Sequence, residues 1–195
     1  MPENQFNKDG FIPKHGGYQK LFSYKKAEII YDGTVYFCNR FFSKYDRTKE
    51  QMIQAARSGK QNIAEGSMFS ATSKEAEIKL TNVARSSLEE LLNDYWDFLR
   101  THKYSEWHKD HPYAKRLREL NRDRDANYDT FKKGIEHENP EISANVLIGL
   151  IKVAKYLLTK QIAKLEQEFL NEGGIRERMA KSRYDKFGKG QKGIK

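Results

Sequence analysis

Three of the five histidines, His102, His108 and His111, lie within ten residues of one another and are the side chains best suited to binding a metal ion. A zinc site also needs thiolate or carboxylate ligands at suitable spacing. The only cysteine, Cys38, is distant in the sequence. Di-iron centres of helical bundles use Glu-x-x-His pairs, and no histidine here has a glutamate three residues before it. We therefore expect solvated loop histidines, with no metal and no other cofactor.

Two further patterns are associated with catalysis. The stretch Gly188-Lys189-Gly190-Gln191-Lys192-Gly193 matches G-x-G-x-x-G spacing, but a dinucleotide site requires a strand before the glycines and a helix after them. The sequence indicates neither, so we interpret this stretch as part of a flexible basic tail. Serine and threonine are frequent, yet no histidine and acid accompany one of them in a pattern that activates a nucleophile. We expect a binding protein without enzyme activity, and an unrecognised enzyme is the least favoured alternative.

The chain carries 36 lysines and arginines against 27 acidic residues, and the excess is concentrated near its C-terminus. Residues 175–195 hold eight basic and two acidic residues. This tail, together with basic residues of the predicted bundle, would neutralise phosphates of RNA or DNA without reading the base sequence, while Tyr184 and Phe187 would stack on unpaired bases. The candidate contacts are Arg57, Lys60, Lys79, Arg85, Arg176, Arg178, Lys181, Arg183, Lys186, Lys189 and Lys192.

A charge-rich tail can also remain solvated without a partner. The second hypothesis is therefore an oligomeric protein-interaction scaffold that makes no direct contact with nucleic acid. Salt separates the two hypotheses, because binding by phosphate neutralisation weakens steeply as salt rises, whereas docking through apolar surfaces need not.

Cysteine usage and the N-terminal sequence bear on location. Cys38 alone cannot form an intramolecular disulfide, which is typical of a reducing cytoplasm. The first residues lack a basic start followed by an apolar stretch, and apolar runs such as 146–151 are far shorter than the roughly 20 residues that span a bilayer. We expect a cytoplasmic protein that does not contact membranes.

Apolar residues at three- and four-residue spacing predict helices throughout. Residues 1–20 are polar and interrupted by glycine and proline, which indicates an N-terminal arm. Thr48 and Gln51 have the spacing of a capping box at the start of the second helix. The inward positions of that helix are small, which predicts close approach of a neighbouring helix. The first helix has as its inward positions Ala27, Ile30, Tyr31, Thr34, Phe37, Cys38 and Phe41, and the second has Met52, Ala55, Ala56, Gly59 and Ile63.

The third helix has the strongest apolar pattern and is capped by the stretch Thr72-Ser73-Lys74-Glu75. Its stripe comprises Leu80, Val83, Ala84, Ser87, Leu88, Leu91, Leu92, Tyr95, Phe98 and Leu99. Residues 103–138 have a weaker pattern, in which Pro112 opens a short helix, and we interpret them as an insertion beside the bundle.

The last predicted helix begins at Asn139-Pro140 and ends at Gly173-Gly174. At roughly 1.5 Å per residue it is longer than the second helix. Its far apolar residues would therefore need cover from a second subunit, which predicts a homo-oligomer. These residues are Leu158, Ile162, Leu165 and Phe169. We expect the bundle to occupy residues 21–174 and to be all-α.

Short motifs connect this chain with a known family. Gln61-Asn62-Ile63-Ala64-Glu65-Gly66-Ser67 is followed by Ser73-Lys74-Glu75 and then by Ala84-Arg85-Ser86-Ser87-Leu88-Glu89-Glu90-Leu91. In these segments the chain resembles the four-helix-bundle family first noticed as open reading frames in intervening sequences of bacterial 23S rRNA genes. The resemblance covers about residues 20–102, and 139–170 by pattern. Residues 103–138 and 172–179 resemble a longer subgroup that carries a C-terminal suffix region.

The resemblance implies an up-down antiparallel four-helix bundle with a helical insertion between helices 3 and 4 and a basic C-terminal tail, often assembled as a ring such as a pentamer, without enzyme activity. A related protein, the accessory variability determinant of diversity-generating retroelements, binds a reverse transcriptase and its template RNA, so a reverse transcriptase is an implied partner. Family members commonly have Arg-Arg and then Ser-Ile-Pro-Ser before the asparagine. This chain has Ile53-Gln54 and Ser58-Gly59-Lys60-Gln61, with Arg57 nearby, so the usual basic patch is displaced.

The motif at residues 61–67 and 73–75 also has a structural interpretation. Asn62 and Glu65 would bond to the backbone of the loop between Gly66 and Ser73, and Gly66 would supply the positive φ that ends the second helix. Together with Ser73 and Glu75, these residues would fix the turn between the second and third helices rather than contact a ligand.

Overall fold

The computed structural model describes residues 17–173, 177, 179–180 and 183–184. These residues contain helices and no strand, which confirms the all-α prediction. The elements are η1 (Tyr18–Lys20), α1 (Phe22–Phe41), α2 (Arg47–Phe69), α3 (Lys74–Thr101), α4 (Pro112–Arg122), α5 (Tyr128–Ile135) and α6 (Pro140–Glu172).

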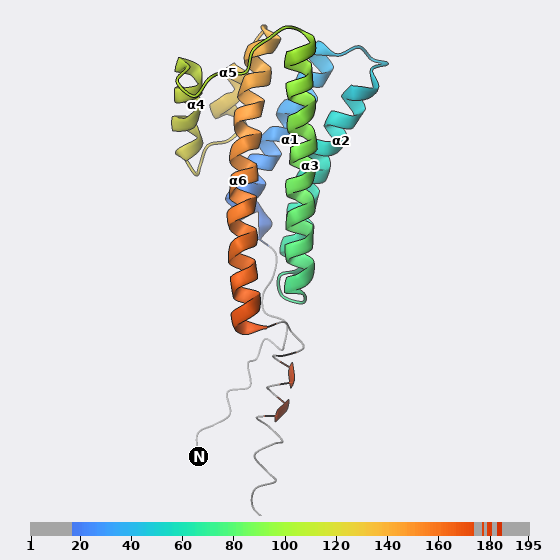
Figure 1. Cartoon of the computed structure of the whole chain (residues 1–195), viewed down its shortest axis with the longest axis vertical. Coiled ribbons are helices and arrows are strands. Elements are labelled where there is room, and N and C mark those ends of the chain that lie inside the picture. Colours follow the sequence, from blue (N-terminus) through green and yellow to red (C-terminus); the bar gives the residue numbers. More distant parts are fainter. Residues whose placement is uncertain (1–16, 174–176, 178, 181–182, 185–195) are drawn as a thin grey trace, which may run out of the picture.

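Four long helices form the body of the protein (Figure 1). Helix α2 packs against α1 and α3, and α6 packs against the same two helices from the other side. The short helices α4 and α5 both contact α6, and α5 also contacts α1. Helices α4 and α5, which lie within residues 103–138, therefore pack beside α6.

Side-chain caps define where the long helices begin. Ser73 Oγ accepts a hydrogen bond from Ala76 N at 3.1 Å, and Asn139 Oδ1 accepts one from Glu141 N at 2.9 Å, so both predicted caps are confirmed. The predicted cap at Thr48 is wrong. Helix α2 begins at Arg47 because the carboxylate of Asp46 accepts the bond from Thr48 N, at 2.9 Å.

The interior is built from the apolar stripes of the four long helices. Phe37 lies at its centre, with its ring centroid 5.0 Å from that of Tyr95 and 4.9 Å from that of Phe98. The hydroxyl of the fully buried Tyr95 donates to Thr34 Oγ1 at 3.1 Å, which satisfies the one polar atom of that side chain. Val83, predicted to face inward, is 45 % exposed, because Ala84, Leu88 and Leu91 occupy the inner face of α3.

Small residues bring α2 and α3 together, as the sequence predicts. A Cβ added at Gly59 would lie 2.8 Å from Leu88 Cδ2, and one at Gly66 would lie 3.4 Å from the carbonyl oxygen of Glu77. Gly66 is helical and α2 continues to Phe69, so the predicted positive φ at Gly66 is wrong. Its role is close approach between helices.

Asn62 also differs from its predicted role. Its amide donates to Ser58 O at 2.9 Å and to Ser58 Oγ at 3.1 Å, within α2. Ser58 Oγ in turn lies 2.9 Å from Ser87 Oγ on α3. Asn62 therefore supports the α2–α3 contact rather than the turn, whose backbone closes on itself through Ser73 N and Phe69 O. Glu65, predicted to bond to the same loop, is half-buried within α2.

Helix α6 runs through the centre of the protein. Six consecutive residues, 143–148, are buried, so this stretch near its start is covered on all sides. Leu158 and Leu165 are buried within the single chain, which corrects the expectation that they need cover from a second subunit. Ser23 and Lys74 reach the far half of α6, where they bond to Gln161 and Glu168 at 3.0 Å each.

Among the described residues one helix, α6, is long and apolar enough to cross a membrane by length and composition alone. Core helices of soluble proteins pass the same test, and 56 % of the apolar stretch is buried inside this protein.

Helix α5 covers a buried lysine. The side chain of Lys26 on α1 is fully buried, and its ammonium lies 4.6 Å from the ring centroid of Phe131 on α5 and 5.1 Å from that of Phe22. No hydrogen-bond partner reaches Nζ from the described residues. Burial lowers the pKa of Lys26 to about 8, although the nearby Asp123 opposes this change.

Candidate nucleic-acid interface

Helix α4 is the most basic exposed element of the described chain. Pro112 occupies its first turn, and Leu117 and Asn121 face inward. The opposite face carries four basic side chains and one acidic one, all exposed: Lys115, Arg116, Arg118, Glu119 and Arg122. The three- and four-residue spacing of the helix sets this separation of apolar and basic sides.

Helix α4 is attached to α6 by close packing. A Cβ added at Gly149 would lie only 2.3 Å from Leu117 Cδ2, so the leucine fills the space that the glycine leaves open. Asn121 is buried beside it and donates to Leu117 O at 3.0 Å. The basic face is therefore held on a rigid support.

The basic side chains of α4 are only partly neutralised within the protein. Arg116 pairs with Glu119 at 3.1 Å across one turn, an exposed pair that contributes little stability. Arg118 donates to Lys109 O at 2.6 Å, which ties α4 to the preceding loop. A bond to a carbonyl leaves the positive charge of the guanidinium intact. The face thus has a net positive charge available to phosphates.

The loop before α4 carries an aromatic cluster. The rings of Trp107 and His111 are stacked, with centroids 5.1 Å apart and planes 6° apart. Tyr113 lies across both, with centroids 5.4 Å from Trp107 and 5.5 Å from His111. His111 is the N-cap residue of α4 and Tyr113 lies in its first turn, so this aromatic cluster directly adjoins the basic face.

A buried asparagine of α6 fixes the loop. Asn145 Oδ1 accepts from Trp107 N at 2.8 Å, and its amide donates to Ser105 O at 3.0 Å. Glu141 Oε1 accepts from Ser105 N at 3.1 Å.

Glu106 fixes the same loop from its own side chain. Its carboxylate accepts a hydrogen bond from Trp96 Nε1 at 2.8 Å and pairs with Lys152. Backbone and side-chain bonds of this kind hold the aromatic cluster in a defined position.

An open hollow of about 330 Å³ lies at the aromatic cluster. Its lining combines the three rings with polar groups and contains no lysine or arginine: Ser105, Glu106, Trp107, His108, His111, Tyr113, Asn139, Glu141 and Ile142. An aromatic wall with polar edges suits a flat, partly polar group.

The basic residues predicted on the bundle lie on α2 and α3, and three of the four already have partners within the protein. Lys60 lies over the Tyr31 ring, 4.2 Å from its centroid, Lys79 pairs with Glu75 at 2.7 Å, and Arg85 donates to Asn82 at 2.8 Å. Arg57 is exposed on α2. In the tail Arg183 and Tyr184 are exposed, whereas Arg176, Arg178, Lys181, Lys186, Phe187, Lys189 and Lys192 lie outside the described residues.

The surface between α2 and α3 is acidic. A hollow of about 490 Å³ there is lined by Glu50 and Glu90 together with glutamine and serine side chains. Asp94 lies one turn beyond Glu90, and burial, with the charges of Glu90 and Asp97, raises its pKa to about 6. A phosphate backbone would be repelled here, which leaves α4 as the better interface.

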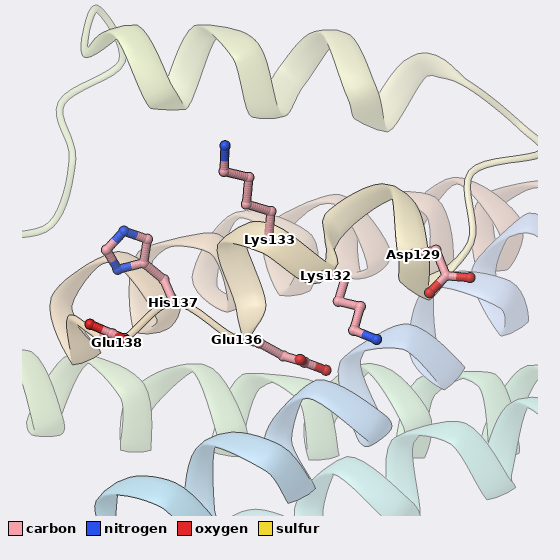
Figure 2. Close-up of a pocket in the computed structure, with 6 residues that line it drawn as sticks. All are labelled: Asp129, Lys132, Lys133, Glu136, His137 and Glu138. Carbon is pink, nitrogen blue, oxygen red and sulfur yellow. The ribbon is translucent and has the colours of Figure 1, made fainter.

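A third hollow lies on α5 and the residues after it, and Figure 2 shows its six lining side chains. Lys132, Lys133 and His137 point in different directions rather than toward one point. Glu136 Oε1 accepts from Tyr128 OH at 3.0 Å, and His137 Nδ1 accepts from Asn139 N at 3.0 Å. The basic side chains of this hollow therefore do not converge on a common point.

The side chains considered for metal binding and for nucleophilic attack, His102 and Cys38, both pack against other side chains of the protein. His102 stacks on Phe98, with ring centroids 4.2 Å apart, and no three His, Cys, Asp or Glu residues of the described chain are placed to hold a metal ion. Cys38 is buried, which raises the pKa of its thiol to about 12. A thiol in this state is a poor nucleophile.

The sequence analysis did not predict the basic face of α4, because charged residues dominate this segment and its apolar pattern is weak. The sequence contains the pattern that could have identified this face. Pro112 marks the start of the helix, and when Leu117 and Asn121 face inward the four basic residues lie on the other side.

Comparison with protein families, with curated proteins and with solved structures finds no match for this chain.

Proposed function

We propose that this protein is a non-catalytic accessory protein that binds RNA through the exposed basic face of α4. The observation that carries the proposal is the four-to-one ratio of basic to acidic side chains on that face, held rigidly by Leu117 against Gly149. Such a surface positions a phosphate backbone without selecting a base sequence. The basic residues of the tail are proposed as a second contact to the same backbone.

We further propose that the fold is an up-down antiparallel four-helix bundle of the 23S intervening-sequence type, with residues 103–138 as its insertion. The ring of contacts from α1 to α2, α3, α6 and back to α1 supports this assignment. The short connections of residues 42–46 and 70–73 support it as well, because short loops join antiparallel neighbours. A reverse transcriptase as partner and a cytoplasmic location belong to the same proposal.

We propose homo-oligomerisation through exposed apolar residues at the end of α6, where Phe169, one of the residues the sequence suggested, is exposed while Leu158 and Leu165 are buried. Leu170 is 81 % exposed at the end of α6, and Met68 and Phe69 are exposed at the end of α2. The Lys74–Glu168 bond joins the start of α3, which follows α2 after a short turn, to the end of α6, and Figure 1 shows the ends of α2 and α6 at the same end of the protein. Exposed apolar side chains at one end of a protein are typical of subunit contacts and also favour the alternative scaffold function.

The test is a charge-removal variant with a matched control. Lys115, Arg116, Arg118 and Arg122 are replaced by glutamine, which retains helix propensity. The control replaces four exposed basic residues elsewhere, Lys44, Arg100, Lys160 and Lys164, so that both variants have the same net charge. We expect the α4 variant to lose at least tenfold in RNA affinity at low salt and the control to lose much less. Equal affinities for the two variants would contradict the proposal.

A further inference from the structure

We propose that the aromatic hollow at the start of α4 binds an unpaired base, so that the RNA recognised by this protein is single-stranded at this point. The inference rests on the proposed function and names the class of RNA that the site takes. It concerns the hollow lined by Trp107, His111 and Tyr113.

The shape of the hollow suits a base better than a phosphate or a sugar. Three aromatic rings meet with centroids 5.1 to 5.5 Å apart, and the Tyr113 side chain is 56 % exposed. A base removed from a helix gains stacking energy on such rings, whereas a paired base within a duplex keeps its faces covered by neighbouring base pairs.

Polar groups at the edge of the hollow complement the edge of a base. Asn139 Oδ1 and Glu141 Oε1 already accept backbone hydrogen bonds. Among the described residues, no hydrogen bond engages the other polar atom of either side chain, the Asn139 amide nitrogen or Glu141 Oε2. A carboxylate oxygen accepts from an exocyclic amino group or a ring N–H, and an amide nitrogen donates to a ring carbonyl. Glu141 would repel a phosphate, which places the base rather than the backbone in the hollow.

The hollow and the basic face are arranged for one strand. Tyr113 precedes Arg116 by three residues and Arg122 by nine, so the basic side chains extend from the hollow for about 14 Å along the helix at roughly 1.5 Å per residue. A strand with one base in the hollow can therefore continue with its phosphates along α4.

The experiment uses Trp107 as its own reporter. The chain has two tryptophans, Trp96 and Trp107. Trp96 is retained because its indole bonds to Glu106 beside the hollow. The emission change of a Trp107→Phe variant at saturating RNA, which comes from Trp96 alone, is subtracted to isolate the response of Trp107. Binding of a single-stranded RNA and of the duplex with the same sequence is followed by anisotropy of a labelled RNA and by tryptophan fluorescence. Each is repeated with Tyr113→Ala, with Tyr113→Phe as the conservative control.

We expect the single strand to quench Trp107 and to bind roughly tenfold more tightly than the duplex, and we expect Tyr113→Ala, but not Tyr113→Phe, to lose roughly fivefold or more in single-strand affinity. Equal binding of strand and duplex without quenching would refute the base pocket and leave the proposed function standing. Absence of binding to both RNAs would refute the proposed function and this inference together. Circular dichroism confirms that each variant is folded.

Discussion

Replacing Lys26 by methionine should stabilise the protein at neutral pH. The lysine is fully buried, its ammonium has no hydrogen-bond partner among the described residues, and burial lowers its pKa from 10.5 to about 8. That lowering corresponds to a cost of about 3 kcal/mol for keeping the charge in the folded state. Methionine keeps the aliphatic chain and removes the charge. The substitution also removes the cation–π contacts with Phe22 and Phe131, which offsets about 1 kcal/mol of this stabilisation. We therefore expect the free energy of unfolding to rise by roughly 1–3 kcal/mol.

The gain should depend on pH in a defined direction. Below pH 8 Lys26 is charged in both the folded and the unfolded protein, and the folded state carries the full cost. Between pH 8 and 10.5 the folded protein releases this proton before the unfolded chain does, so the stability of the parent rises with pH. The advantage of Lys26→Met should therefore be full at pH 7 and smaller by about 2 kcal/mol at a pH of about 9.5.

Denaturant unfolding followed by circular dichroism at the two pH values measures this effect. Lys25→Met is the matched control, because its side chain is 38 % exposed and 3.8 Å from the exposed Asp125. It should change the free energy of unfolding by no more than about 0.5 kcal/mol. A Lys26→Met protein less stable than the parent at pH 7, or a difference independent of pH, would refute the reasoning.

Three further substitutions test the packing and the electrostatics. Leu88→Ala should destabilise the fold by roughly 2–5 kcal/mol, because Leu88 is fully buried against Gly59, and an unchanged melting curve would contradict this. Gly149→Ala should cost roughly 1–3 kcal/mol in unfolding experiments and weaken RNA binding, since its Cβ would collide with Leu117 and displace α4. Asp94→Asn should stabilise the protein at pH 7 by roughly 1 kcal/mol, a value discounted for partial exposure. Because the folded-state pKa of Asp94 is raised to about 6, the stability cost appears as pH rises from about 4 to 6, and the gain from asparagine should vanish toward pH 4 in the same unfolding assay.

Local patterns in the sequence predicted most of the helical structure. The caps at Ser73 and Asn139, the end of α6 at Gly173 and the small residues facing α3 depend on a few neighbouring residues, and the structure confirms them. The start of α2 was misplaced because Asp46 and Thr48 are both good capping residues. Only the backbone conformation decides which of them accepts the bond.

Features that depend on tertiary contacts could not be derived in this way. A glycine at Gly66 suits both a helix end and a close helix contact, and the partner helix decides between them. Leu158 and Leu165 looked exposed on a helix that exceeded its neighbour in length, but the ends of α1 and α3 reach the same region. The basic face of α4 could not be predicted from local patterns alone, because the packing of Leu117 against Gly149 of α6 decides which side of the helix faces water.

The salt dependence of RNA affinity tests the proposed interface most directly. Affinities of the parent and of the α4 variant with Lys115, Arg116, Arg118 and Arg122 replaced by glutamine are measured for one single-stranded RNA from about 50 to 200 mM salt. If these side chains neutralise phosphates, the slope of log affinity against log salt should be flatter in the variant by about 3, since each contact to a single strand contributes about 0.7. Equal slopes for the two proteins would contradict the assignment of the interface to α4.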